Sequence, residues 1–222
     1  MKILFMGRKQ VSANLLRFLT KQDHIEIVGV LTDNHLQGSP TTAAAQELGL
    51  PLYTFDTALE AMREGRLKYD LGLSVLYWRK LRDEFLSIPT LGTINFHPAL
   101  LPEYKGTGGY NLAIMDELNE WGNTAHYVDA SIDTGEIIEV DRFPIEAETE
   151  TAQSLERKTM QALEDFARRI ITRAIESKTK LPTTPNIGGR YVSRDEMEAM
   201  KQIRDGDDVE KKIRAFWFPP YD

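Results

Sequence analysis

The chain has no cysteine among its 222 residues. Disulfides and thiolate metal sites are therefore excluded, and we expect a cytoplasmic protein. The chain also lacks any apolar run near the length of about 20 residues that crosses a bilayer, so we expect no membrane association. Its start, MKILFMG, runs into the polar residues RKQ, which is typical of a buried first strand rather than a signal peptide.

Basic residues are fewer than acidic residues in this chain. The 27 Lys and Arg residues stand against 34 Asp and Glu residues, which gives a net charge of −7. A nucleic-acid-binding protein would rest its affinity on a basic surface, so we expect no nucleic-acid partner. Hydrophobic residues make up 41% and charged residues 27% of the chain, as in a soluble globular protein with a substantial core.

Glycine-rich phosphate motifs are missing as well. The first turn, MGRKQVS, has one glycine where a dinucleotide fingerprint has three, and no P-loop pattern occurs. Binding of NAD or of a nucleotide through a P-loop is therefore not expected. Arg8 and Lys9 remain candidates for a phosphate clamp at the start of the first helix. The alternative is a pair of solvated charges on a loop.

Apolar periodicity predicts alternating strands and helices over the first 100 residues. Strands are expected at residues 2–7, 25–33, 52–55 and 70–78 and in the run that enters Asn95 and His97, with helices at 11–22, 41–49, 58–65 and 82–88. This order favours an α/β fold with a doubly wound, mostly parallel sheet and a Rossmann-like N-terminal core. Ligands of such sheets bind beyond the carboxyl ends of the strands, so residues 7–9, 76–80 and 95–97 should share one rim.

The later chain is expected to complete this core and then to change character. We predict a helix at 109–121, strands at 124–132 and 136–145, and a long helix at 149–177. Pro182 and Pro185 then break the chain. The remaining stretch is dense in charge until an aromatic end, so we expect a catalytic core at residues 1–180 and a C-terminal appendage at 181–222.

The stretch INFHPALLPEYKG, residues 94–106, concentrates unusual chemistry. Asn95 and His97 are two apart at the end of a strand, so their side chains can point the same way. Pro98 then prevents regular strand pairing, and a loop follows. Taken alone, an Asn-x-His pair is more often a hydrogen-bonded loop pair than a catalytic one.

The chain has four histidines, of which two bear on a site. His24 and His35 lie in polar segments, and we assign them no role. A metal site built from His97, His126 and two aspartates is conceivable, but no HExxH or comparable ligand spacing occurs, so no metal is expected. His126 is more readily a structural, hydrogen-bonded histidine near the site.

Three short patterns in order are far more specific than any of them alone. They are Asn95-x-His97-Pro98-x-Leu100-Leu101-Pro102, then Thr124-x-His126, then Asp133-x-Gly135. Together they closely resemble the 10-formyltetrahydrofolate-dependent formyltransferase family, from Met1 to about Phe143 and again in the C-terminal stretch. The resemblance implies Asn95, His97 and Asp133 as the catalytic trio and 10-formyltetrahydrofolate as co-substrate.

The segment LYWRKL resembles the folate-binding segment of that family, with the loop 127–133 closing the slot from the other side. The cofactor-binding residues implied are Leu76, Tyr77, Trp78, Arg79, Lys80, Leu81, Asp129 and Ile132.

The chemistry of the trio suits formyl transfer. A neutral amine attacks the formyl carbonyl and creates a tetrahedral oxyanion, to which protonated His97 and the Asn95 amide can both donate. One such donor is typically worth about 10²–10³ in rate. Asp133 can hold His97 charged and can accept the amine proton directly or through a water.

The acceptor must be inferred from the rest of the chain. Methionyl-tRNA formyltransferases carry a further basic domain, for which this chain has neither the length nor the charge. Glycinamide ribonucleotide formyltransferases open with a glycine-, serine- and asparagine-rich phosphate loop, where GRKQVSANLL stands here. The stretches KKIRAFWFPPYD and LLPEYKGTGGYN resemble enzymes that formylate nucleotide-linked amino sugars. We therefore expect a sugar N-formyltransferase that acts on a dTDP-linked amino-dideoxy sugar, for surface polysaccharide such as lipopolysaccharide O-antigen.

The sugar N-formyltransferase hypothesis predicts substrate contacts at both ends of the chain. We also expect the appendage to contact the sugar nucleotide, or a second copy of the chain in a homodimer. The substrate-binding residues expected are Arg8, Lys9, Lys105, Tyr110, Asn111, Trp217 and Tyr221. The C-terminal aromatic rings, including Phe216, suit stacking on a nucleobase, and packing in a core or dimer is the alternative. Relatives usually continue beyond the position of Asp222, which leaves a short member or a trimmed chain as alternatives.

Other functions stay open at this point. Glycinamide ribonucleotide and methionyl-tRNA-type formyltransferases belong to the same family. A formyltetrahydrofolate hydrolase would use the same trio with water as acceptor, and would turn over the folate without any amine. A non-catalytic folate or nucleotide-sugar binding protein would keep the slot without needing Asp133.

Overall fold

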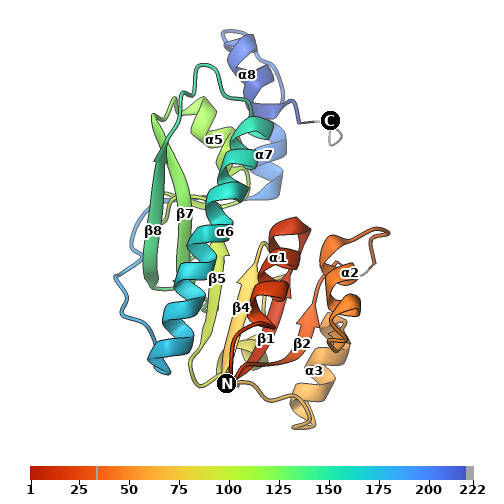
Figure 1. Cartoon of the computed structure of the whole chain (residues 1–222). Coiled ribbons are helices and arrows are strands. Elements are labelled where there is room, and N and C mark those ends of the chain that lie inside the picture. Colours follow the sequence, from red (N-terminus) through yellow and green to blue (C-terminus); the bar gives the residue numbers. More distant parts are fainter. Residues whose placement is uncertain (34, 219–222) are drawn as a thin grey trace.

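The protein is described by a computed structural model over residues 1–33 and 35–218 (Figure 1). Its elements, in chain order, are β1 Lys2–Gly7, α1 Lys9–Leu19, β2 Glu26–Leu31, α2 Pro40–Glu47, β3 Leu52–Tyr53, α3 Phe55–Arg63, β4 Leu71–Val75, α4 Asp83–Ser87, β5 Thr93–His97, β6 Tyr104–Gly106, α5 Gly109–Met115, β7 Glu120–Tyr127, β8 Ile137–Pro144, α6 Ala152–Ser177, β9 Arg190–Val192, α7 Arg194–Met200 and α8 Val209–Phe216.

The main sheet has seven strands in the order β3-β2-β1-β4-β5-β7-β8. The first five strands in that order are parallel, while β7 runs antiparallel to β5 and β8 antiparallel to β7. The chain winds from β1 outward to β3 and then returns to β4 on the other side of β1. The predicted doubly wound, mostly parallel α/β sheet is thus confirmed, with its topological switch between β1 and β4.

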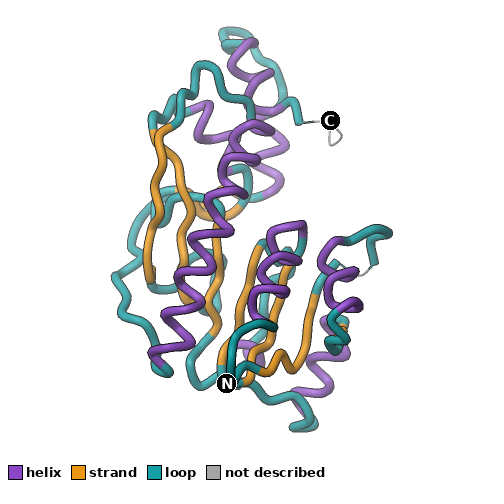
Figure 2. The backbone as a smooth tube through the Cα atoms, in the orientation of Figure 1, coloured by secondary structure: helices purple, strands orange, loops and turns teal. Residues whose placement is uncertain are grey.

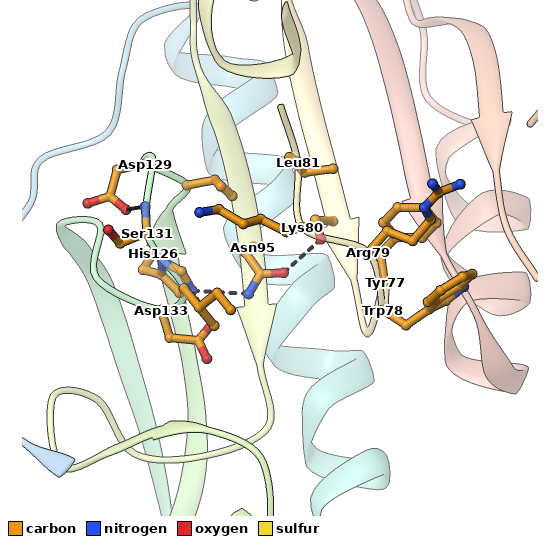
Figure 3. Close-up of a pocket in the computed structure, with 13 residues that line it drawn as sticks. Tyr77, Trp78, Arg79, Lys80, Leu81, Asn95, His126, Asp129, Ser131 and Asp133 are labelled. Carbon is orange, nitrogen blue, oxygen red and sulfur yellow. Dashed lines mark hydrogen bonds and ion pairs between the residues drawn. The ribbon is translucent and has the colours of Figure 1, made fainter. Parts of the chain in front are cut away.

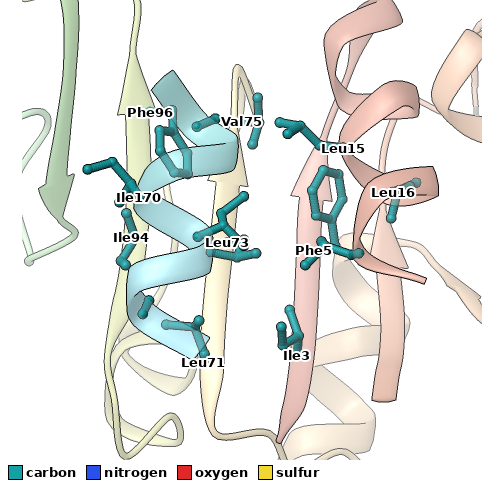
Figure 4. Packing of buried hydrophobic residues seen from close by; sticks show 14 of the residues in the cluster. Ile3, Phe5, Leu15, Leu16, Leu71, Leu73, Val75, Ile94, Phe96 and Ile170 are labelled. Carbon is teal, nitrogen blue, oxygen red and sulfur yellow. The ribbon is translucent and has the colours of Figure 1, made fainter. Parts of the chain in front are cut away.

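Both faces of the sheet are covered, because alternate residues of a strand point to opposite sides. On one face Ile3 and Phe5 pack with residues of α1 and α6, as Figure 4 shows. On the other face Leu4 and Met6 pack with Phe55 and its neighbours on α3. Burial on both faces is the reason that β1 is a continuous apolar run in the sequence.

A second group of elements lies beyond one end of the sheet. In Figure 2 the long helix α6 runs from the sheet to a lobe where α5, α7 and α8 gather, and β7 and β8 extend toward the same lobe. Trp121 of β7 is fully buried there against Ala99 and Leu100. The segment predicted as an appendage therefore contributes β9, α7 and α8 to this lobe; the domain division at residue 180 remains a prediction.

Within the described ranges, no helix is both long and apolar enough to span a membrane.

The helix predicted at 109–121 is shorter than expected. It ends at Met115, and β7 already begins at Glu120. Glu117 has a φ of 52°, a left-handed conformation that cannot continue a right-handed helix. Leu118 and Trp121 are three apart, a spacing that fits a helix face but here belongs to a turn and a strand in one cluster.

Candidate active site

The carboxyl ends of β1, β4 and β5 meet at one rim, as the sequence predicts. Gly7 ends β1, Leu76 follows β4, and His97 ends β5. Leu76 has a φ of 57° and Lys9 a φ of 67°, in the left-handed region that costs a residue with a Cβ about 1–3 kcal/mol. Residues with this left-handed backbone conformation are found more often at functional sites than elsewhere. Here two of them, Lys9 and Leu76, lie on the same rim of the sheet.

The Asn95 amide is fixed in one orientation by its neighbours. Its Oδ1 accepts a hydrogen bond of 2.7 Å from the Ser74 hydroxyl, and its Nδ2 lies 3.0 Å from Nε2 of His126 (Figure 3). His126 Nδ1 lies 2.8 Å from the Tyr127 carbonyl, which can only accept, so Nδ1 carries the proton and Nε2 accepts from Asn95. The second N–H of Asn95 makes no hydrogen bond with any residue of 1–33 or 35–218, so it is available to a ligand.

His126 is held neutral. Burial, followed by the nearby His97, lowers the pKa of His126 from 6.5 to about 4. A neutral ring is what the hydrogen bond from Asn95 requires. His126 therefore acts in the structure as the hydrogen-bonded histidine that the sequence suggested. Over residues 1–33 and 35–218, no group of three or more His, Asp or Glu side chains is arranged to hold a metal ion.

The buried His126 should make the protein sensitive to acid. Below about pH 6.5 the unfolded chain binds a proton at this ring, whereas the folded protein does so only near pH 4. Stability should thus fall as pH decreases through this window, by up to about 3 kcal/mol. We expect His126→Gln to reduce this loss, measured as the free energy of unfolding in urea at about pH 7 and pH 4.5. An equal acid loss in both proteins would contradict the assignment.

His97 and Asp133 face each other across the site. His97 Nε2 lies 2.9 Å from the Tyr104 carbonyl and therefore donates to it, while Nδ1 lies 3.6 Å from Oδ2 of Asp133. The Asp133 carboxylate also accepts a 2.9 Å hydrogen bond from the Gly106 N–H, and its other oxygen lies 3.7 Å from His126 Nε2. The carboxylate thus lies between the two imidazoles, is held by the Gly106 N–H, and is largely buried.

A tight turn between β7 and β8 carries Asp133 to this position. Asp133 itself has a φ of 55°, and a Cβ on Gly135 would lie 1.8 Å from the Tyr127 carbonyl oxygen. Gly135 is therefore needed for the close approach of two backbone segments. Asn186, from the segment before β9, donates to the carbonyls of Asp133 and Gly135 at 3.0 and 2.9 Å.

Two cavities meet at the trio. The smaller has a volume of about 140 Å³ and the larger about 740 Å³. Asn95 and Asp133 line both of them, and His97 lines the larger. The other residues that the two cavities share are Tyr77, Trp78 and Ile132. A group bound in one cavity therefore meets a group bound in the other beside the predicted catalytic residues.

The predicted ligand residues divide between the two cavities. The smaller is lined by Tyr77, Trp78, Arg79, Lys80, Leu81, Asp129 and Ile132, all predicted for the cofactor (Figure 3). The larger is lined by Arg8, Lys9, Tyr110 and Asn111, predicted for the substrate, and by Leu76, predicted for the cofactor.

Two of the predicted substrate residues, Lys105 and Trp217, line neither cavity. Lys105 is 8% exposed, and its ammonium donates to the Gly188 carbonyl at 2.7 Å. Trp217 follows α8 and is 56% exposed outside both linings. Tyr221 lies outside the described residues. Phe216 packs near Ile114 and Ala215, which is the core alternative for that ring. The substrate roles of Lys105, Trp217 and Tyr221 remain predictions.

Several residues of the site were not found by sequence reasoning. Ser74, Glu156, Tyr191, Arg194 and Met197 line the cavities, and Asn186 supports the Asp133 turn. Ser74 carries a weak signal, as a hydroxyl residue in an otherwise apolar strand. The other five are distant in sequence from the motifs and carry no signal of their own.

Comparison with known proteins shows the family of the chain. The family described as Formyl transferase matches residues 1–174. Methionyl-tRNA formyltransferase of Lysinibacillus sphaericus is 30% identical over 203 residues, which are 83% of this chain and 64% of that protein. The chain thus spans less than two thirds of that relative's length.

Solved structures share the fold at lower identity. An N-formyltransferase from Helicobacter canadensis, in complex with folinic acid and dTDP-3-aminofucose, has a TM-score of 0.79 at 24% identity and covers 100% of this chain and 82% of its own. A 4-N formyltransferase from Francisella tularensis has a TM-score of 0.81 at 20% identity, covering 99% and 89%. Since the family match includes Asn95, His97 and Asp133 and most of the 222 residues, the chain belongs to the formyl transferase family.

Proposed function

We propose that the protein transfers a formyl group from 10-formyltetrahydrofolate to the amine of a nucleotide-linked amino-dideoxy sugar, with a dTDP-linked sugar as the acceptor. The observation that carries the proposal is the meeting of two cavities at Asn95 and Asp133. Transfer between two bound molecules requires two compartments that open onto one set of catalytic groups.

The smaller cavity suits the folate head group. A volume of about 140 Å³ is well below the roughly 300–1,000 Å³ of pockets that enclose a whole drug-sized ligand. It would hold a flat ring system, while the rest of the folate would extend past Trp78, which is 53% exposed. Burial raises the pKa of Tyr77 to about 12, so its phenol stays neutral in this wall.

Asn95 and His97 stabilise the oxygen charge that develops during transfer. The acceptor amine forms a bond to the formyl carbon, and the carbonyl electrons move onto oxygen. The free N–H of Asn95 donates to this oxygen, as does His97 when Nδ1 is protonated. Ser74 and His126 hold the Asn95 amide in place beforehand, so no reorganisation is needed at the moment of reaction.

Asp133 handles the proton. Its carboxylate lies next to Nδ1 of His97 and accepts the amine proton directly or through a water. When the bond between the formyl carbon and the folate nitrogen breaks, that nitrogen needs a proton, which the same network returns. The formyl group thus changes nitrogen with no net change in protons on the protein.

The choice of a sugar acceptor is supported by the fold neighbours. One of them is described in complex with folinic acid and dTDP-3-aminofucose, and its likeness covers this whole chain. The role we propose in surface polysaccharide synthesis, by a cytoplasmic homodimer, rests on the same resemblance; sedimentation analysis of the purified protein would check the dimer.

An acceptor panel tests the proposal. The protein is incubated with 10-formyltetrahydrofolate and, in turn, with several nucleotide-linked amino sugars, glycinamide ribonucleotide, methionyl-tRNA and no amine. Mass spectrometry should show the mass of a formyl group added to at least one amino sugar. Formylation of only glycinamide ribonucleotide or methionyl-tRNA would overturn the acceptor class. Release of formate without any amine would indicate a hydrolase.

A further inference from the structure

The larger cavity contains positive charge that the protein does not neutralise. Among its charged residues, Lys9 is paired with Glu156, and Asp133 lies beside His97. Arg8 and Arg194 make no ion pair with any residue in the described part of the chain. Nε of Arg8 is buried and has no hydrogen-bond partner. A buried donor without a partner is uncommon in folded proteins and points to a missing acceptor.

These two arginines come from opposite ends of the chain. Arg8 follows β1 on the rim, and Arg194 is the first residue of α7. The strand before α7 is held in register, because β9 pairs with β6 so that Val192 lies opposite Gly106. The Gly106 N–H donates to Asp133, so Arg194 stands at a fixed offset from the catalytic carboxylate.

We propose that Arg8 and Arg194, which line the larger cavity together with the trio, hold the phosphate groups of the acceptor. A guanidinium donates two parallel hydrogen bonds to phosphate oxygens, and two guanidinium groups match the two negative charges of the diphosphate in a nucleotide-linked sugar. The volume of about 740 Å³ lies within the range of small-molecule sites. This assignment deepens the proposed function and replaces Lys9, which Glu156 neutralises, with a residue that sequence reasoning did not find.

Direct binding measurements test this proposed phosphate site (the phosphate seat, Arg8 and Arg194) separately from the acceptor panel. We would titrate dTDP and inorganic pyrophosphate into the native protein and into Arg8→Gln, Arg194→Gln and Arg204→Gln. Arg204 is a matched control, since it also lies in the C-terminal segment but does not line the cavity. Each of the first two variants should weaken binding by about tenfold or more and reduce its salt dependence, while the control should bind as the native protein does.

The outcomes separate the two proposals. If the native protein binds pyrophosphate but not dTDP, the phosphate seat stands and the nucleotide-sugar acceptor falls. If Arg194→Gln binds both ligands as tightly as the control, the seat is wrong whatever the acceptor. If the native protein binds neither dTDP nor pyrophosphate, the proposed phosphate site is wrong as well.

A second inference concerns Asn186 and rests on different contacts. The segment before β9 is hydrogen-bonded to the start of β8, because the backbones of Thr184 and Ile137 exchange two hydrogen bonds of 2.9 and 2.8 Å. Two residues later, the Asn186 amide spans the carbonyls of Asp133 and Gly135. We infer that Asn186 is a positioning residue, which keeps Asp133 in its left-handed conformation beside His97.

Kinetics can distinguish positioning from simple stabilisation. Asn186→Ala should lower kcat about tenfold while the KM values for both substrates stay within about twofold, because only the carboxylate moves. Thr183→Ala is the control. Thr183 lies in the same segment as Asn186, and its hydroxyl donates to the exposed Glu136 side chain rather than to the Asp133 turn. Rates are expressed per folded protein. A variant with a lower melting temperature but an unchanged kcat would assign Asn186 a structural role and overturn the inference.

Discussion

Replacing Asn95 by alanine is expected to lower kcat by at least about 10² while folate binding survives. In the proposed mechanism the side chain supplies one N–H to the developing oxyanion, and Asn95 is one of the 13 residues that line the smaller cavity. His97→Asn should have an effect of similar size, because it removes the donor that faces Asp133 and keeps a polar side chain at the strand end.

Single-turnover formylation and folate titration together check this prediction. Asn14→Ala is a suitable control, because Asn14 lies on α1 and donates to Glu164 away from both cavities. Near-native turnover in either variant would remove the oxyanion assignment. Ser74→Ala offers a finer comparison, since it loosens the Asn95 amide without removing it and should reduce kcat less than Asn95→Ala does.

Asp133→Asn should abolish most of the chemistry and leave both ligands bound. The amide keeps an oxygen that can accept the Gly106 N–H, so the turn between β7 and β8 should survive. It cannot take the amine proton and cannot pair with a charged His97. General-base groups typically contribute about 10²–10⁴ in rate, and we expect a loss in that range.

The behaviour of Asp133→Asn distinguishes the hypothesis of an enzyme from that of a non-catalytic binding protein. If Asp133→Asn formylates at the native rate, Asp133 serves only the turn. If the variant loses folate affinity instead, the carboxylate belongs to the binding slot. The activity of the native enzyme should fall on the acid side of its pH profile, because the attacking amine must be neutral.

The sequence was sufficient to predict the site wherever the determinants are local. Asn95 and His97 end a strand of a parallel sheet, and the rim of such a sheet collects its ligands. Asp133 was reached through the family resemblance, and the structure brings its carboxylate to His97. The sheet itself follows from apolar runs that are long enough to be buried on both faces.

Pairings between distant segments could not be predicted. Lys105 is predicted from the sequence as a substrate residue, with Tyr110 and Asn111, in and after the loop that follows Pro98. In the structure its loop forms β6, which pairs with β9, and the ammonium is turned to Gly188, 83 residues later. The same pairing brings Arg194 and Tyr191 to the cavity. Nothing in the charge pattern of residues 181–222 indicates which strand β9 will join.

The wall shared by the two cavities has a kinetic consequence. Tyr77, Trp78 and Ile132 line both compartments, so each ligand forms part of the surroundings of the other. Binding of one should change the affinity for the other, and by the same factor in both directions. If transfer occurs where the compartments meet, as we propose, both molecules must be present together. Initial-rate plots should therefore intersect, as for a sequential mechanism, rather than run parallel as for a formyl-enzyme intermediate.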